Sequence, residues 1–438
     1  MHDDTDRRDR FFVLKGWHIA LAVLVILAGL IGLYLIVQQN RVEARLKALR
    51  AAGYPTSLTE LAQYTKLPEG AENAAEIYRQ AFAAYVRPAD EANTPVLGKA
   101  QWPARGAPLP MPMVEAISQY LAANQKCLAL LHDAASIEQC RYEDDYTQAT
   151  IALPPECRYC EQLLNVAAIY HASQGQAEAA VTCLKDGLRL SDSLRREPAL
   201  LGHLMRISFA GAAIRGLERS LSLTTFREAQ LQELRDMLGR TRDTLDFTEA
   251  LVTERCVMLE NCRNPARLGP SGQVSATRIV PGLRVTWLSD TLDTMADYLE
   301  AVRQPPRERL ARCREIEGRI RQLPLWHVMI KIMTPAVTRI VELDLRARAH
   351  LDLATTALAI ERYRLATGKV PGQLEDLAPQ YLQQVPVDPF DGKPIRYEPG
   401  SPGYLLYSVG EDGRDDGGRE RNDKDHNAPY DLCFIVTR

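Results

Sequence analysis

A long apolar run near the N-terminus constrains this chain more than any other feature. Residues 16–37 are almost all apolar. At about 1.5 Å per residue, a helix over this run crosses the roughly 30 Å hydrocarbon layer of a membrane. Trp17 and Tyr34 lie near its two ends, where amphipathic rings favour the headgroup level. The run predicts a transmembrane helix that follows a short N-terminal tail over residues 1–15.

A cleaved signal peptide is the alternative interpretation of this run. Signal peptides have a shorter apolar segment that ends at a small-x-small cleavage site. Here the apolar run ends in Gln38, Gln39 and Asn40 instead. The pattern therefore favours an uncleaved, single-pass anchor and makes the membrane the first expected partner.

The charges that flank the anchor do not orient it. Four cations precede the apolar run and four follow it: Arg7, Arg8, Arg10, Lys15, then Arg41, Arg45, Lys47 and Arg50. Long domains cross a membrane largely regardless of such charges, so we expect the short tail inside and the bulk of the chain outside. The net charge of −3 gives no basic field, which argues against nucleic acid as a partner.

Residues 38–344 have the pattern of a mainly helical body. A capped helix is predicted over 57–64 and a longer one over 71–86, followed by a Pro- and Gly-rich loop over 87–112. Residues 164–192 have the small-and-large alternation of a tetratricopeptide-like helical hairpin, although one such unit is a weak signal. We expect an irregular α-helical bundle or a short solenoid.

The nine cysteines leave their pairing open. Cys157 and Cys160 are close in sequence, and so are Cys256 and Cys262. A zinc ribbon needs a second pair at comparable spacing, and a thioredoxin-like site needs a βαβ setting. One or two disulfides are expected if the body lies outside, and buried thiols if it lies inside. Scattered packing cysteines with at most one bridge are the favoured interpretation.

Composition changes after Gly368, where strand-like runs alternate with loops rich in Gly, Pro and Asp. The runs are 395–398, 404–409 and 432–436. This region contains, in order, a helix that ends in Ala-Thr, the residues Gly-Lys-Val-Pro, then Tyr381-Leu382, Val387-Asp388-Pro389-Phe390 and Tyr407-Ser-Val-Gly-Glu-Asp-Gly413. This order of motifs over residues 345–438 resembles the globular head of the major pseudopilin of type II secretion systems, the G protein. The resemblance implies a small α+β module, and a bacterial inner membrane with the body in the periplasm.

The chain departs from that family in three respects. Pseudopilin heads follow directly on the N-terminal helix, whereas here the helical body separates them. Leu21 stands where the family has a Glu at the fifth mature position, and Phe390 replaces the usual Trp. We therefore expect a module joined to an anchored helical protein rather than a polymerising pilin.

The acidic loop after residue 409 is the predicted metal site. Carboxylates, backbone carbonyls and permissive glycines together suit calcium, which takes six to eight oxygen ligands. The resembling family binds calcium in this loop. Carried over by position, the ligands are the Val409 carbonyl, Asp412, Asp423 and Asp425. Bound calcium would have a structural role; the alternative is a solvated turn.

No catalytic motif is found in the sequence. Nucleophile-elbow, zinc-protease, Walker A and dinucleotide-binding patterns are all absent from the printed chain. We therefore expect a membrane-anchored, non-enzymatic scaffold that binds protein partners and has a link to type II secretion. Two alternatives stay open: a peptide-binding receptor built on helical repeats, and an enzyme of unrecognised class in the helical body.

Overall fold

The computed structural model describes most of the chain. Its described residues are 5–95, 100–143, 145–146, 155–197, 199–264, 281–333, 337–400, 402–421 and 428–438. The described part is mostly helical and has one small antiparallel sheet, as the sequence predicts.

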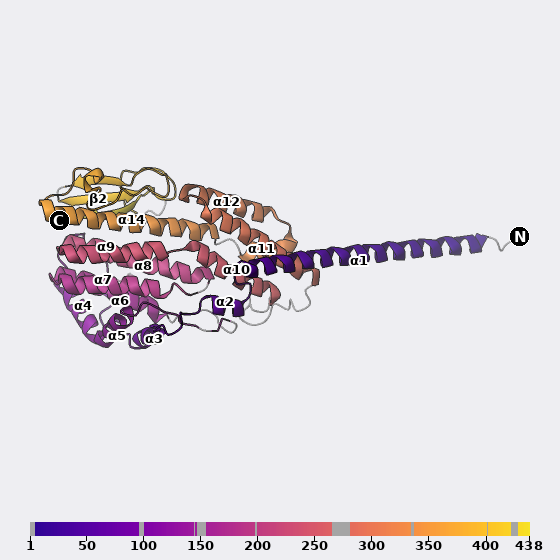
Figure 1. Cartoon of the computed structure of the whole chain (residues 1–438), viewed down its shortest axis with the longest axis horizontal. Helices are drawn as coiled ribbons and strands as arrows, with labels where there is room; N and C mark the ends of the chain where they lie inside the picture. Colours follow the sequence, from indigo (N-terminus) through magenta and orange to yellow (C-terminus); the bar gives the residue numbers. More distant parts are fainter. Residues whose placement is uncertain are drawn as a thin grey trace.

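One helix, α1 (Thr5–Ala51), leads from the N-terminal tail into the body. Its part from Trp17 onward is long and apolar enough to cross a membrane, and no residue of its most apolar window is buried in the isolated chain. Figure 1 shows α1 projecting from one end of the body as a single straight rod. Near its C-terminal end, Val42 and Leu46 are buried against Leu259 and Leu292. The apolar run is therefore continuous with a segment that packs into the body.

The first part of the body contains four short helices. Ser57 caps α2 by accepting a hydrogen bond from the Glu60 backbone N–H (3.2 Å). The predicted helix over 71–86 is shorter than expected, because the Asn73 side chain binds the backbone of Arg141 and also accepts from the Ala75 N–H. These helices are α2 (Leu58–Tyr64), α3 (Ala75–Ala83), α4 (Met111–Ala123) and α5 (Gln125–Ala135).

The predicted helical hairpin over 164–192 is confirmed as the pair α6 and α7. Gly175, at φ +71°, makes the turn between them. The next helices continue the stack: α4 packs on α6 and α6 on α8, while α5 packs on α7 and α7 on α9. Figure 1 shows this succession of layers. The elements are α6 (Glu156–Ser173), α7 (Ala177–Ser193), α8 (Ala199–Leu223) and α9 (Glu228–Thr244).

A second group of helices lies at the end of the body from which α1 emerges. There α11 packs between α10 and α12 and also contacts α1. Two short elements, η3 and α13, follow α12 and pack on α11. The elements are α10 (Phe247–Arg263), α11 (Pro281–Arg303), α12 (Pro306–Gln322), η3 (Leu325–His327) and α13 (Val328–Met333).

The last part of the chain joins a long helix to the sheet. The helix α14 (Val337–Thr367) is followed by η4 (Leu374–Leu377). The strands β1 (Arg396–Gly400), β2 (Gly403–Ser408) and β3 (Leu432–Val436) form an antiparallel sheet in the order β1-β2-β3. As an edge strand, β1 tolerates Pro399, which has no N–H to donate.

The sheet shares its hydrophobic core with the helical stack. Leu406 of β2 and Phe434 of β3 belong to the same buried cluster as Leu358 of α14, Leu217 of α8 and Leu184 of α7. Figure 1 shows the sheet lying over α14. The helix α14 also runs unbroken through residues 344 and 345, where the sequence suggests a domain boundary. The C-terminal module and the body therefore fold around common apolar side chains.

Candidate functional site

The candidate site is the acidic loop that leaves β2 and returns to β3. Val409, its first residue, is buried, and its N–H donates to Asp388 Oδ2 (2.9 Å). Asp412 is exposed and accepts from the Arg414 N–H (3.0 Å), which makes a local turn. The other two predicted ligands, Asp423 and Asp425, lie outside the described residues. Of the four predicted ligand residues, the structure thus describes the surroundings of two.

A buried carboxylate fixes the base of this loop. Asp388 has no exposed surface and accepts from the Ser408 hydroxyl (3.0 Å), the Val409 N–H (2.9 Å) and the Phe390 N–H (3.0 Å). Arg396 of β1 donates to its Oδ2 (3.0 Å). The motif Val-Asp-Pro-Phe therefore anchors the end of β2, and this places the start of the acidic loop.

Sequence reasoning missed a second carboxylate, Asp431, which lies directly before β3. Asp431 is buried, and its Oδ2 accepts from the Gly418 N–H (2.8 Å) and the Asp416 N–H (3.1 Å). Burial raises the pKa of Asp431; the two backbone N–H groups oppose that rise, and the nearby charges of Asp416 and Asp415 add to it. The loop backbone is therefore wrapped round a carboxyl group that is costly to ionise.

Two buried carboxylate oxygens of this loop lack a hydrogen-bond donor. They are Asp431 Oδ1 and Asp416 Oδ2. An unpaired buried oxygen costs free energy unless a proton, a water or a cation satisfies it. Within the described residues, no three His, Cys, Asp or Glu side chains converge as a metal-binding group. The described part thus offers carboxylates that suit a hard cation, although it does not contain a complete ligand set.

A pocket of about 330 Å³ adjoins Asp431, between α8, α14 and the loop. Arg346 on its wall donates to the Tyr430 hydroxyl (2.8 Å) and pairs with Glu411 (2.5 Å). Arg105 pairs with Glu218 of α8 (2.9 Å), whose carboxylate also accepts from the Ile435 N–H of β3 (2.8 Å). These contacts connect the sheet to the helical stack. Arg346 and Arg105 therefore both have structural partners.

An enzyme of unrecognised class in the helical body was one of the two alternatives that the sequence left open. Burial raises the pKa of Glu197 to about 7 and that of Asp186 to about 6. Glu197 and His203 both line a cavity of about 20 Å³, which is room for about one water molecule. Asp186 instead pairs with His132 (3.2 Å). These perturbed groups occur singly and not around a substrate-sized space.

The cysteines are all free thiols. The two sequence-adjacent pairs are not bridged; instead, Cys160 of α6 has Cys127 of α5 as its sulfur neighbour, at an Sγ–Sγ distance of 3.6 Å. Cys256 donates to the Pro55 carbonyl (3.1 Å), and Cys262 contacts the Thr291 hydroxyl (3.4 Å). Helix packing, rather than sequence spacing, decides which thiols meet.

Comparison with known proteins assigns no relative to this chain. No family model matches it, and neither a curated protein nor a solved structure does.

Proposed function

We propose that this chain is a single-pass, membrane-anchored scaffold that is not an enzyme and presents a helical body to protein partners. The observation that carries the proposal is the continuity of α1. One helix includes the apolar run and, further on, the buried residues Val42 and Leu46 of the body. A stiff connection of this kind fixes the height and orientation of the body above the bilayer, which suits a scaffold.

The proposed compartment and pathway rest on the sequence motifs of residues 345–438. Their resemblance to a pseudopilin head supports a bacterial inner membrane, with the body in the periplasm and a link to type II secretion. Crosslinking in cells, followed by purification in detergent, tests this link. Recovery of secretion-machine subunits is the expected result, and their repeated absence under efficient crosslinking would count against it.

We further propose that the acidic loop binds calcium in a structural role. Asp431 and Asp416 each carry an oxygen without a donor, and calcium prefers oxygen ligands of this kind. The Val409 carbonyl and Asp412, with Asp423 and Asp425, remain the other proposed ligands. Bound calcium would neutralise the acidic loop and hold it against β3, next to Asp431.

Calcium titration of the full chain in detergent, followed by thermal melting, tests this site. At a concentration 100 times the Kd, bound calcium stabilises the folded state by about 2.7 kcal/mol. We expect a rise in melting temperature that grows with pH, because calcium competes with the proton for Asp431, whose pKa is raised.

The variant Asp431→Asn separates metal binding from general destabilisation. Asparagine keeps an oxygen for the Gly418 and Asp416 N–H groups but removes the buried charge. We therefore expect the variant to lose the calcium response while its melting temperature without calcium is unchanged or higher. Asp133→Asn, at an exposed carboxylate of α5, is the matched control and should respond like the unmodified chain. If the melting temperature of the unmodified chain does not rise at several millimolar calcium, the loop is a solvated turn and not a calcium site.

A peptide-binding receptor is the second candidate, and a specific observation favours it. The hairpin α6–α7 packs against α4 and α5 on one side and against α8 and α9 on the other, and about three stacked units are needed for a stable solenoid. Selection from a random peptide library on the purified protein tests this candidate. Enrichment of one sequence class would support a groove, whereas unselective binding would leave the scaffold as the better account.

A further inference from the structure

Four large apolar side chains are exposed together on residues 325–332, which we call the apolar segment. The exposed fractions are 83% for Leu325, 59% for Trp326, 39% for Val328 and 64% for Ile332. The segment comprises η3 and most of α13. Single exposed apolar residues need no explanation, but a contiguous group of them marks a surface that something else covers.

The apolar segment is held firmly in its outward position by α11. Trp287 of α11 is buried, and its Nε1–H donates to the Trp326 carbonyl (2.9 Å). The His327 Nδ1 contacts Asp290 Oδ2 at 2.5 Å. Because polar contacts fix the backbone and the His327 ring on α11, the neighbouring indole and leucine side chains remain on the outside.

The segment lies level with the end of the apolar run of α1. Arg45 of α1 pairs with Asp293 of α11 (2.7 Å). Closer to the C-terminal ends of both helices, Leu49 of α1 and Glu300 of α11 line one cavity. The two helices therefore run in the same direction. Along the axis of α11, Trp287 lies about 9 Å before Asp293, at a rise of 1.5 Å per residue. The same step back from Arg45 reaches Gln39, where the apolar run gives way to polar residues.

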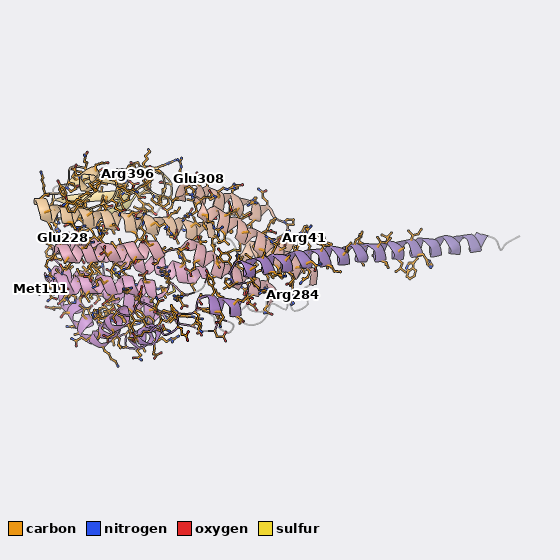
Figure 2. The ribbon with its side chains drawn as sticks, viewed as in Figure 1. Arg41, Met111, Glu228, Arg284, Glu308 and Arg396 are labelled. Atoms are coloured by element: carbon orange, nitrogen blue, oxygen red, sulfur yellow. The ribbon has the colours of Figure 1, made fainter. Side chains whose placement is uncertain are left out.

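The figures agree with this placement. In Figure 2, Arg41 and Arg284 both lie at the end of the body from which α1 emerges, whereas Met111 lies at the opposite end. Both arginines are exposed, and neither forms an ion pair with any residue in the part of the chain that the structure describes. Cations at this level suit lipid phosphates, and the indole of Trp326 suits the headgroup level.

We infer that the apolar segment inserts into the headgroup–acyl boundary of the same membrane that α1 crosses. This inference rests on the proposed anchor. The body would then be fixed to the bilayer at two points, which prevents it from rotating about α1. We choose a lipid surface as the occupant because the segment continues, at the same depth, the apolar surface that α1 presents to lipid. Burial of such side chains at the interface removes apolar surface from water and is therefore favourable.

Lipid-quenching fluorescence on the full chain in bilayers tests this inference. Leu325→Cys receives an environment-sensitive probe, and the bilayer contains phosphatidylcholine brominated on its acyl chains, which quenches probes only at short range. Met111→Cys is the matched control, since Met111 is also apolar and 66% exposed but lies at the far end of the body. Leu24→Cys, within the apolar run and 62% exposed, reports the anchor itself. The unmodified chain, whose own thiols are buried or half-buried, gives the labelling background.

The expected result is that probes at 24 and 325 lose most of their fluorescence, while the probe at 111 is unaffected. Quenching at 24 without quenching at 325 would overturn the inference and leave the anchor standing. Quenching at neither position would overturn the anchor as well. Energy transfer between probes at 325 on two copies, without lipid quenching, would show that a second copy covers the segment and would likewise overturn the inference.

Discussion

Replacing Glu161 by glutamine is expected to make the protein more stable at alkaline pH and to leave it unchanged near pH 4.5. Glu161 lies on α6 and is 6% exposed. Its carboxyl group has no hydrogen-bond or ion-pair partner among the residues described. Burial raises the pKa of its carboxyl group to about 8 from an ordinary value of 4.5, and the charge of Arg215 opposes only part of that rise.

The magnitude follows from proton linkage. The folded state binds the Glu161 proton more tightly than the unfolded state, so its stabilising effect is fully present below about pH 4.5 and is lost as pH rises to about 8. Each pH unit in this window costs about 1.4 kcal/mol of unfolding free energy. The loss reaches about 3 kcal/mol at pH 7 and about 4 kcal/mol at pH 8. Glutamine stays neutral at every pH, so the variant does not lose this unfolding free energy.

Thermal melting of the full chain in detergent between about pH 4.5 and pH 8.5 measures the effect. The melting temperatures of Glu161→Gln and the unmodified chain should coincide at the acid end and diverge steadily up to about pH 8. Glu115→Gln, at an exposed position of α4, should follow the unmodified chain throughout. A difference between Glu161→Gln and the unmodified chain that does not change with pH would refute the reasoning, because it would show that Glu161 ionises alike in both states.

Two other changes test the packing. Gly403→Ala should cost several kcal/mol, because its Cβ would lie 1.8 Å from the Val436 carbonyl oxygen. Gly53 also has a positive φ (+81°, against +97° for Gly403) but faces open space, so Gly53→Ala should cost only about 1 kcal/mol. Equal losses of melting temperature in the two variants would contradict this. Oxidation of the folded chain with diamide should bridge Cys127 to Cys160 first, since their sulfurs lie 3.6 Å apart. A peptide map with a different first bridge would show that this contact is not the closest in solution.

Local pattern predicts several elements well. Ser57 caps a helix where the sequence places one, and the hairpin over 164–192 forms with its turn at Gly175. The three strands lie within two residues of the predicted runs. These features depend on caps, periodicity and turn residues that are adjacent in the chain, which is why the sequence alone reveals them.

The candidate site was predicted less completely. Val409 and Asp412 follow from the motif, but Asp431 and Asp416 acquire their unpaired oxygens only when the loop closes on β3. A single Asp before a strand is an ordinary feature of a sequence. Burial is decided by residues far along the chain, so no local pattern distinguishes Asp431 from a solvated turn residue.

By itself the sequence determined that this protein has one N-terminal helix able to cross a membrane, a helical body and a small C-terminal sheet. Length, apolar periodicity and turn residues suffice for those conclusions. Only the tertiary structure decided that the sheet shares a core with α7, α8 and α14, and that residues 325–332 expose their apolar side chains. An apolar run has the same pattern whether it is buried or exposed, because the difference lies in which distant helices cover it.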